Sequence, residues 1–127
     1  MEDIHIEGSK GVYIVPTVHF DAKTGICEIS GESFLEETAR FYNPLIEWIK
    51  NYVKDASHIQ FIFKLTYFNT STSKWILSIL NELKMFEKNG GKAEIKWYYH
   101  EEDLDMRDDI QDYVVDTGLS IQLLPFE

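Results

Sequence analysis

The chain has 127 residues, of which 22 are acidic and 12 are Lys or Arg, so its formal net charge is −10. This acidity argues against nucleic acid and against an anionic membrane surface as the main partner, because both are bound through basic patches. Hydrophobic residues make up 44% of the chain, which is enough for a core and too many for a disordered protein. We expect residues 1–127 to form a single domain, because domains commonly have about this length.

The features that report on cellular compartment favour the cytoplasm. Cys27 is the only cysteine, so the chain has no internal disulfide, as is usual in a reducing environment. The N-terminus begins with acidic residues and lacks the positive region and apolar run of a secretory signal. No apolar stretch approaches the roughly 20 residues of a membrane helix. We therefore expect a cytoplasmic protein without membrane insertion.

Hydrophobic periodicity predicts five strands and three helices. Apolar residues that alternate indicate strands, and apolar residues three or four apart indicate helices. Gly, Pro and Asn fall between these segments, as in turns. In chain order, the predicted elements are strands at 12–18 and 26–30 around a turn at 21–25, a helix over 35–53, a strand at 58–68, a helix over 76–86, a strand at 92–99, a helix over 101–117 and a strand at 119–124.

The order β-β-α-β-α-β-α-β indicates the fold class. The β-α-β units need parallel neighbouring strands with right-handed crossovers, whereas the opening hairpin adds antiparallel pairing. The strand at 58–68 carries apolar residues on both of its sides, so we expect it at the centre of the sheet and buried on both faces. The prediction is an α/β fold with a mixed sheet whose helices lie mainly on one face.

Two features concern the first predicted helix. Ser33 and Glu36 match a capping box, in which the serine hydroxyl and the glutamate carboxylate satisfy free N–H groups of the first turn. Pro44 lies inside the apolar stripe that follows, where a proline removes one hydrogen bond and crowds the preceding turn. We therefore expect a cap at Ser33 and either a kink near position 44 or two helical pieces.

Sequence motifs for catalysis or cofactor binding are absent. There is no G-x-S-x-G elbow, P-loop or G-x-G-x-x-G, and the four histidines show no metal-ligand spacing. We expect no enzymatic activity, no cofactor and no metal site. An alternative is a small enzyme or ligand-binding protein with a pocket lined by Trp48, Trp75, Trp97 and the tyrosines, although aromatic residues are more often part of the core.

One segment between a predicted strand and a predicted helix is unusually rich in hydroxyl groups. Asn69 is followed by Thr70, Ser71, Thr72 and Ser73. One such side chain suffices to cap a helix, whereas four make a small polar surface at its positive end, where a phosphate is electrostatically favoured. Phosphorylation would add a charge of about −1.5 to −2. No acidic residue lies between Lys64 and Asn81, so this would be a large local change.

Residues 65–74, which contain this hydroxyl segment, resemble the signature of the SiaC-type regulatory phosphoproteins. These are small bacterial proteins with a STAS-like fold, similar to anti-sigma-factor antagonists. Further matching segments are Gly31-Glu-Ser-Phe34 followed by Glu36, Ile46-Glu-Trp-Ile49, and Gly90-Gly91 before Ile95-Lys-Trp-Tyr-Tyr99. The resemblance covers nearly the whole chain and implies a STAS-like regulatory domain.

The resemblance also implies a partner-switching function. The implied phosphorylation site is Thr70, directly after Asn69, with Ser71 and Thr72 as secondary candidates and residues 69–73 in contact with partners. The implied partners are a dedicated serine/threonine kinase, a PP2C-type phosphatase and a diguanylate cyclase. The unphosphorylated form would bind and stimulate the cyclase, which links the switch to c-di-GMP signalling and biofilm control. An alternative within the same fold is an anti-sigma-factor antagonist that acts on transcription.

Overall fold

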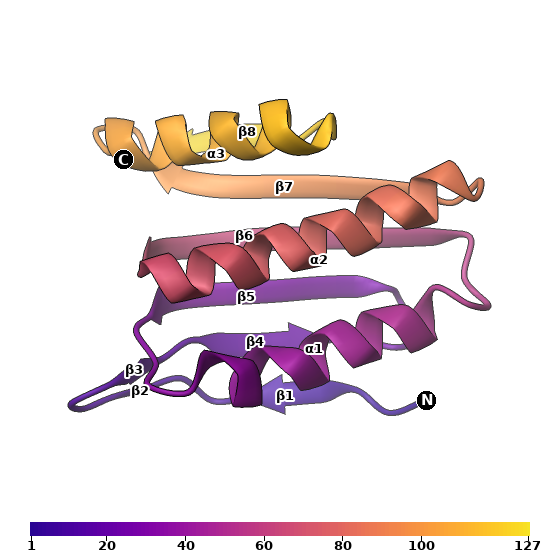
Figure 1. The fold of residues 1–127 in the computed structure, drawn as a ribbon, viewed down its shortest axis with the longest axis horizontal. Helices are drawn as coiled ribbons and strands as arrows, with labels where there is room; N and C mark the ends of the chain where they lie inside the picture. The colour runs from indigo at the N-terminus through magenta and orange to yellow at the C-terminus, as the bar shows by residue number, and fades with distance from the viewer.

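The computed structural model describes residues 1–127 as a six-stranded mixed sheet with three helices packed on one face (Figure 1). The strand order is β1-β4-β5-β6-β7-β8, and β2 and β3 form a separate two-stranded ribbon. This confirms the predicted α/β class. The elements are β1 (Ile4–Ile6), β2 (Ser9–Lys10), β3 (Ile14–Val15), β4 (Thr17–Phe20), β5 (Ile26–Ser33), α1 (Thr38–Tyr52), β6 (His58–Phe68), α2 (Thr70–Lys88), β7 (Lys92–His100), α3 (Leu104–Thr117) and β8 (Gln122–Phe126).

The pairing of the strands follows the predicted division of the sheet. β4 and β5 form the expected antiparallel hairpin, in which Phe20 lies opposite Cys27, and β1 adds a further antiparallel strand at the edge. From β5 to β8 all neighbours are parallel. β6 lies between β5 and β7, which confirms its central position. Its bounds, His58–Phe68, agree with the predicted strand.

The two faces of β6 differ, and the expectation that both are buried is wrong. Phe61, Phe63 and their alternating neighbours are fully buried under the helices, whereas Ile62 is only half-buried and Lys64 is exposed on the other face. The parallel strands follow one another across the sheet in a single direction. Right-handed crossovers that all step in one direction place every helix on the same side, so the other face of the sheet stays open.

The start of α1 corrects the expected cap at Ser33. Ser33 is the last residue of β5, and the N-cap position of α1 is Glu37, whose side chain makes no capping hydrogen bond. α1 is also one helix with Pro44 inside it, rather than two pieces. The missing proline N–H leaves the Arg40 carbonyl without its helical partner. Arg40 lies on the exposed side of the helix, which limits the cost of that loss.

β1 and β2 escaped the sequence prediction, because strands of three and two residues are too short to show periodicity. The strand predicted at 12–18 is divided into β3 and the first residues of β4, so the bounds of that prediction were wrong. β8 begins three residues later than predicted. The stops after the second and third helices are confirmed, with C-caps at Asn89 and at Gly118, whose φ of 75° suits a glycine.

Gly91, just after α2, provides a stability test of the packing between helix and sheet. A methyl group at this position would collide with the ring of Phe86, which is buried in the core. We expect Gly91→Ala to lower the free energy of unfolding by about 1–3 kcal/mol, because overpacking forces the core to shift. Gly11→Ala is the control, since its methyl group would meet only the Tyr13 carbonyl oxygen at 3.8 Å. Equal urea denaturation midpoints for both variants would contradict this packing.

Candidate functional site

The hydroxyl segment lies where the central strand β6 passes into α2. In parallel sheets, functional groups commonly gather at the carboxyl ends of the strands, where the following helices begin. Here this end carries the last residues of β5 to β8 and the first turns of α2 and α3, on the left side of Figure 1. The segment therefore lies at the end of the molecule where such folds usually place their sites.

Asn69 caps α2, so the hydroxyl groups of residues 70–73 are not needed as the helix cap. Its backbone is extended, with φ −85° and ψ 175°, and its side-chain oxygen accepts a hydrogen bond from the backbone N–H of Thr72 at 3.1 Å. The Ser71 hydroxyl donates to the same oxygen at 3.1 Å. An asparagine at this position satisfies one of the free N–H groups of the first turn in the usual way. The cap thus explains the asparagine, and the hydroxyl groups need another explanation.

Thr72 belongs to a buried network of hydroxyl groups. Its side chain is 0% exposed, and its Oγ1 lies 2.9 Å from the Oγ of Ser33. Ser33 Oγ is in turn 2.8 Å from the Tyr42 hydroxyl, so the network joins β5, α1 and α2. Burial raises the pKa of Tyr42 to about 12, which keeps the ring neutral. Thr72, a secondary candidate for phosphorylation, is therefore inaccessible to a kinase in the folded protein.

Ser73 joins α2 to α3. Its Oγ lies 2.7 Å from the Tyr113 hydroxyl, which donates to the Ser73 carbonyl oxygen at 3.1 Å. Thr70 differs from its neighbours, because it is exposed at the first position of α2 and its hydroxyl makes no hydrogen bond within the protein. Ser71 is also exposed, but its hydroxyl is held by Asn69. Thr70 is thus the one hydroxyl of the four that is both accessible and unengaged.

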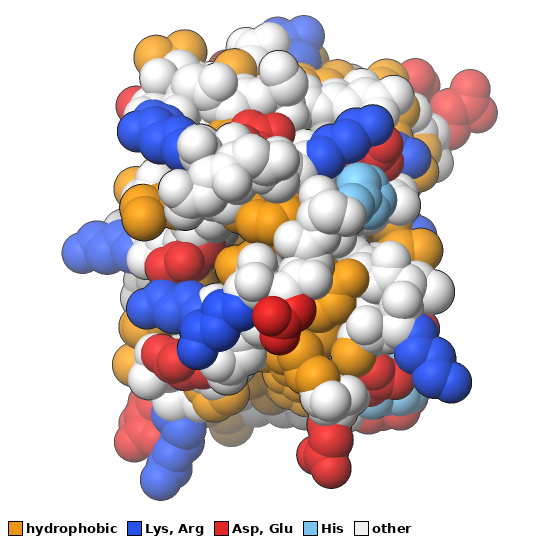
Figure 2. All heavy atoms as spheres, turned by 90° about the vertical axis from the view of Figure 1, so that its right-hand side faces the viewer, with side chains coloured by type: hydrophobic (Ala, Val, Ile, Leu, Met, Phe, Trp, Pro, Cys, Tyr) orange, Lys and Arg blue, Asp and Glu red, His pale blue; other side chains and the backbone are white.

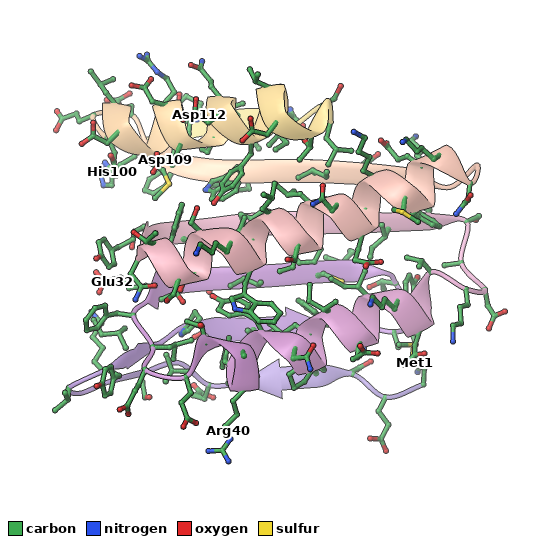
Figure 3. The ribbon with its side chains drawn as sticks, in the orientation of Figure 1. Met1, Glu32, Arg40, His100, Asp109 and Asp112 are labelled. Atoms are coloured by element: carbon green, nitrogen blue, oxygen red, sulfur yellow. The ribbon has the colours of Figure 1, made fainter.

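A hollow of about 340 Å³ adjoins this hydroxyl, and α3 supplies its acidic wall. Asp109, Asp112 and Asp116 line it opposite Thr70 and Ser73. Figure 3 shows Asp109 and Asp112 on α3, which starts at the same end of the sheet as α2. The segment is free of acids in the sequence, yet the fold brings three carboxylates to it. No Lys or Arg lines the hollow, so its local charge is negative.

Asp109 provides a pH-dependent test of this acidic wall. Partial burial, followed by the charges of Asp112 and Asp105, raises the pKa of its carboxyl above the ordinary 3.8. A raised pKa in the folded state means that ionisation of this group opposes folding as the pH rises above 3.8. We therefore expect Asp109→Asn to raise the melting temperature at pH 7 and to lose this advantage below pH 3.8, measured by circular dichroism.

The control for this prediction is Asp55→Asn, at an exposed position that makes no ion pair. It should leave the melting temperature unchanged at both pH values. A stabilisation by Asp109→Asn that is equal at neutral and acidic pH would contradict the assignment, because the gain would then not come from the carboxylate charge.

A larger hollow lies at the opposite end of the molecule. It measures about 530 Å³ and lies between the C-terminal ends of α1 and α2, next to Met85 and Phe86. Figure 2 views this end and shows basic and acidic side chains intermingled around an apolar strip. Lys50 there lies 3.8 Å from Glu82, so its charge already has a partner. Ser57 is the only hydroxyl residue that lines this hollow, so it has no hydroxyl cluster comparable to the first turn of α2.

The tryptophans of the alternative ligand pocket lie in packing contacts. Trp97 is fully buried and stacks on Phe63 with ring centroids 4.3 Å apart, and Trp48 stacks on Tyr52 at 5.1 Å. Trp75 is half-buried on α2, where it packs against the core. These contacts are those of core residues. None of the three helices combines the length and apolarity that crossing a membrane requires.

One protein family and one curated protein match most of the sequence. The family model of the SiaC family regulatory phosphoproteins matches residues 6–126. An uncharacterized protein of Pseudomonas aeruginosa strain UCBPP-PA14 is 26% identical over 100 residues, which cover 78% of this chain and 77% of that protein.

Solved structures share the fold. The crystal structure of apo-SiaC from Pseudomonas aeruginosa superposes with a TM-score of 0.84 at 21% identity and covers 98% of this chain and 99% of that one. The crystal structure of the diguanylate cyclase SiaD in complex with its activator SiaC, from the same organism, contains a chain that matches with a TM-score of 0.90 at 21% identity. That match covers 98% of this chain and 100% of the other.

Proposed function

The chain belongs to the SiaC family of regulatory phosphoproteins, and on this basis we propose that it is a non-enzymatic switch controlled by phosphorylation of Thr70. A serine/threonine kinase adds the phosphate and a PP2C-type phosphatase removes it. The unphosphorylated form binds and activates a diguanylate cyclase, and the phosphorylated form does not. In this proposal residues 1–127 act as one cytoplasmic regulatory domain that needs no cofactor.

The accessibility of Thr70 is the observation that carries the proposal. A kinase must reach the hydroxyl it modifies, and Thr70 is exposed while Thr72 is fully buried. Ser71 and Ser73 have hydroxyl groups engaged by Asn69 and Tyr113. Modification at Thr70 therefore breaks no hydrogen bond within the protein, and it leaves the cap and the buried network in place.

The surroundings of Thr70 explain how a phosphate would change docking. The N-terminus of α2 favours a negative charge by roughly 0.3–1 kcal/mol. The hollow beside it already contains three aspartates and no basic side chain. The hollow therefore offers no counter-ion to a phosphate of about −1.5 to −2, and the cation nearest to Thr70 in the chain is Lys74, one helical turn along α2. A partner that covers this end must desolvate the phosphate or supply cations, and an apolar or acidic partner surface is rejected.

The cyclase as effector is supported by the shared fold. A relative with the same architecture is described as the activator of the diguanylate cyclase SiaD and is seen in complex with it. This chain superposes on a chain of that complex over nearly its full length. We carry the class of partner over to this chain as part of the proposal, and the residues that contact it are expected to include Asn69, Thr70 and Ser71.

The proposal is tested by mapping the phosphate. We expect incubation with the cognate kinase and ATP to place phosphate on Thr70, as read by mass spectrometry of proteolytic peptides. Thr70→Ala should lower incorporation by about tenfold or more, because the other hydroxyl groups of the segment are buried or engaged. Thr70→Ser keeps a hydroxyl at the same place and should still be modified.

The matched control is Ser71→Ala, which removes the neighbouring exposed hydroxyl and should leave the incorporation unchanged. Phosphate that remains on Thr70→Ala at the wild-type level, or that maps to a residue other than Thr70 in the wild type, would refute the assignment of the site.

A further inference from the structure

The open face of the sheet carries aromatic side chains near the end where α2 begins. Ser33 points inward to the buried hydroxyl network, so its neighbours Glu32 and Phe34 point to the open face. Tyr67 lies opposite Glu32 in the β5–β6 register and faces the same way. Phe34 is 39% exposed and Tyr67 48%, so both rings are accessible from the solvent.

These side chains form one surface, which we call the aromatic notch and define as Tyr13, Glu32, Phe34 and Tyr67. Glu32 and Tyr67 are register partners in the parallel β5–β6 pair, so their side chains are neighbours on this face. Phe34 is two residues further along the same face, and its ring centroid is 5.9 Å from that of Tyr13. A hollow of about 250 Å³ adjoins the notch between β5 and the β2–β3 ribbon. Figure 3 shows Glu32 at the end of β5, on the side of the molecule where α2 begins.

Glu32 is the charged centre of the notch and has no cation. Elsewhere on the open face, Glu28 pairs with Lys64 at 3.1 Å, and Glu94 lies 3.9 Å from Lys92. Glu32 is half-buried, yet no Lys, Arg or His nitrogen lies within 4.0 Å of its carboxylate. Lys10 lines the adjoining hollow without reaching it. A half-buried glutamate that shares its face with Phe34 and Tyr67 and has no cation of its own is complementary to a cation supplied from outside.

We propose that the aromatic notch binds an arginine side chain of the effector protein. The guanidinium group is planar, so it can stack on Tyr67 or Phe34 and at the same time donate two hydrogen bonds to the Glu32 carboxylate. A lysine ammonium offers neither the plane nor the fork. A second copy of this chain is a poor occupant, because each copy carries a net charge of −10. The inference rests on the proposed function only in naming the effector.

A small probe tests the notch without any partner. We expect N-acetyl-arginine methylamide, added at millimolar concentration to ¹⁵N-labelled protein, to shift the amide resonances of Glu32, Phe34 and Tyr67. The lysine analogue should shift them less, and Glu32→Gln should abolish the shifts. No shift at these residues, or equal shifts in Glu32→Gln, would overturn the proposal.

A second measurement uses the purified cognate cyclase. Glu32→Gln and Tyr67→Ala should each weaken its binding by about tenfold or more in calorimetric titration, because an arginine would lose its partner. Glu94→Gln, the same charge change on the same face, should have no effect. If both notch variants bind the cyclase with the affinity of the wild type, the notch proposal is overturned and the proposed function stands. Failure of the wild type to bind the cyclase would refute the proposed function, and the arginine titration would then decide the notch alone.

Discussion

Thr72→Asp is expected to destabilise the protein by about 3 kcal/mol or more, whereas Thr70→Asp is expected to change its stability by less than about 1 kcal/mol. The two residues are two positions apart in one segment. Thr72 is fully buried and bonded to Ser33, so a carboxylate there would be unpaired inside the core. Thr70 is exposed at the positive end of α2, which favours a carboxylate. Urea denaturation followed by circular dichroism at pH 7 measures both.

Thr72→Val is the control that separates the effect of the buried charge from the loss of the hydroxyl group. It keeps the volume of the side chain and removes only the hydroxyl, so we expect a smaller loss of about 1–3 kcal/mol from the network with Ser33 and Tyr42. Equal stability of Thr72→Asp and Thr70→Asp would contradict the burial of Thr72, and with it the argument that selects Thr70 from the four hydroxyl residues.

Thr70→Asp is expected to weaken binding of the diguanylate cyclase by about tenfold or more, whereas Thr70→Ala binds like the wild type. The carboxylate mimics part of the phosphate charge in a hollow that already holds three aspartates and no basic side chain. A partner that covers this end would have to desolvate that charge. Calorimetric titration of the purified cyclase gives the affinities, and cyclase activity at saturation shows whether activation is lost with binding.

Asn81→Asp is the matched control for this second prediction. It adds one negative charge to an exposed position of the same helix, three turns from Thr70. It should leave the affinity unchanged. A comparable loss in Asn81→Asp would show that net charge, rather than charge at the first turn of α2, controls docking.

The long, periodic elements were predictable from the sequence, and the reason is physical. β6 alternates apolar residues over eleven positions, and α2 and α3 end at Asn89 and Gly118, which suit helix ends. Ser33 shows where local reasoning failed. Its spacing to Glu36 matches a capping box, but pairing of β5 with β6 and the buried bond to Tyr42 hold it at the end of a strand. Tertiary contacts decided between two locally acceptable structures.

The candidate site was predictable only in part. Asn69 and the hydroxyl residues are adjacent in the chain, so their segment could be found by inspection. The features that distinguish Thr70 from Thr72 come from contacts across about forty positions, from Thr72 to Ser33 and from Ser73 to Tyr113. Asp109 and Asp112 likewise reach the segment from another helix. No local pattern reports such contacts, so the acidic wall and the buried network required the structure.

The central claim is that phosphate on Thr70 reversibly controls effector binding. The most direct measurement is calorimetric titration of the cyclase with one preparation of the protein in three states: unmodified, phosphorylated by the kinase, and phosphorylated then treated with the PP2C-type phosphatase. The account predicts binding in the first state, a loss of about tenfold or more in the second, and full recovery in the third. Equal affinity in all three states, with phosphate confirmed on Thr70, would contradict it.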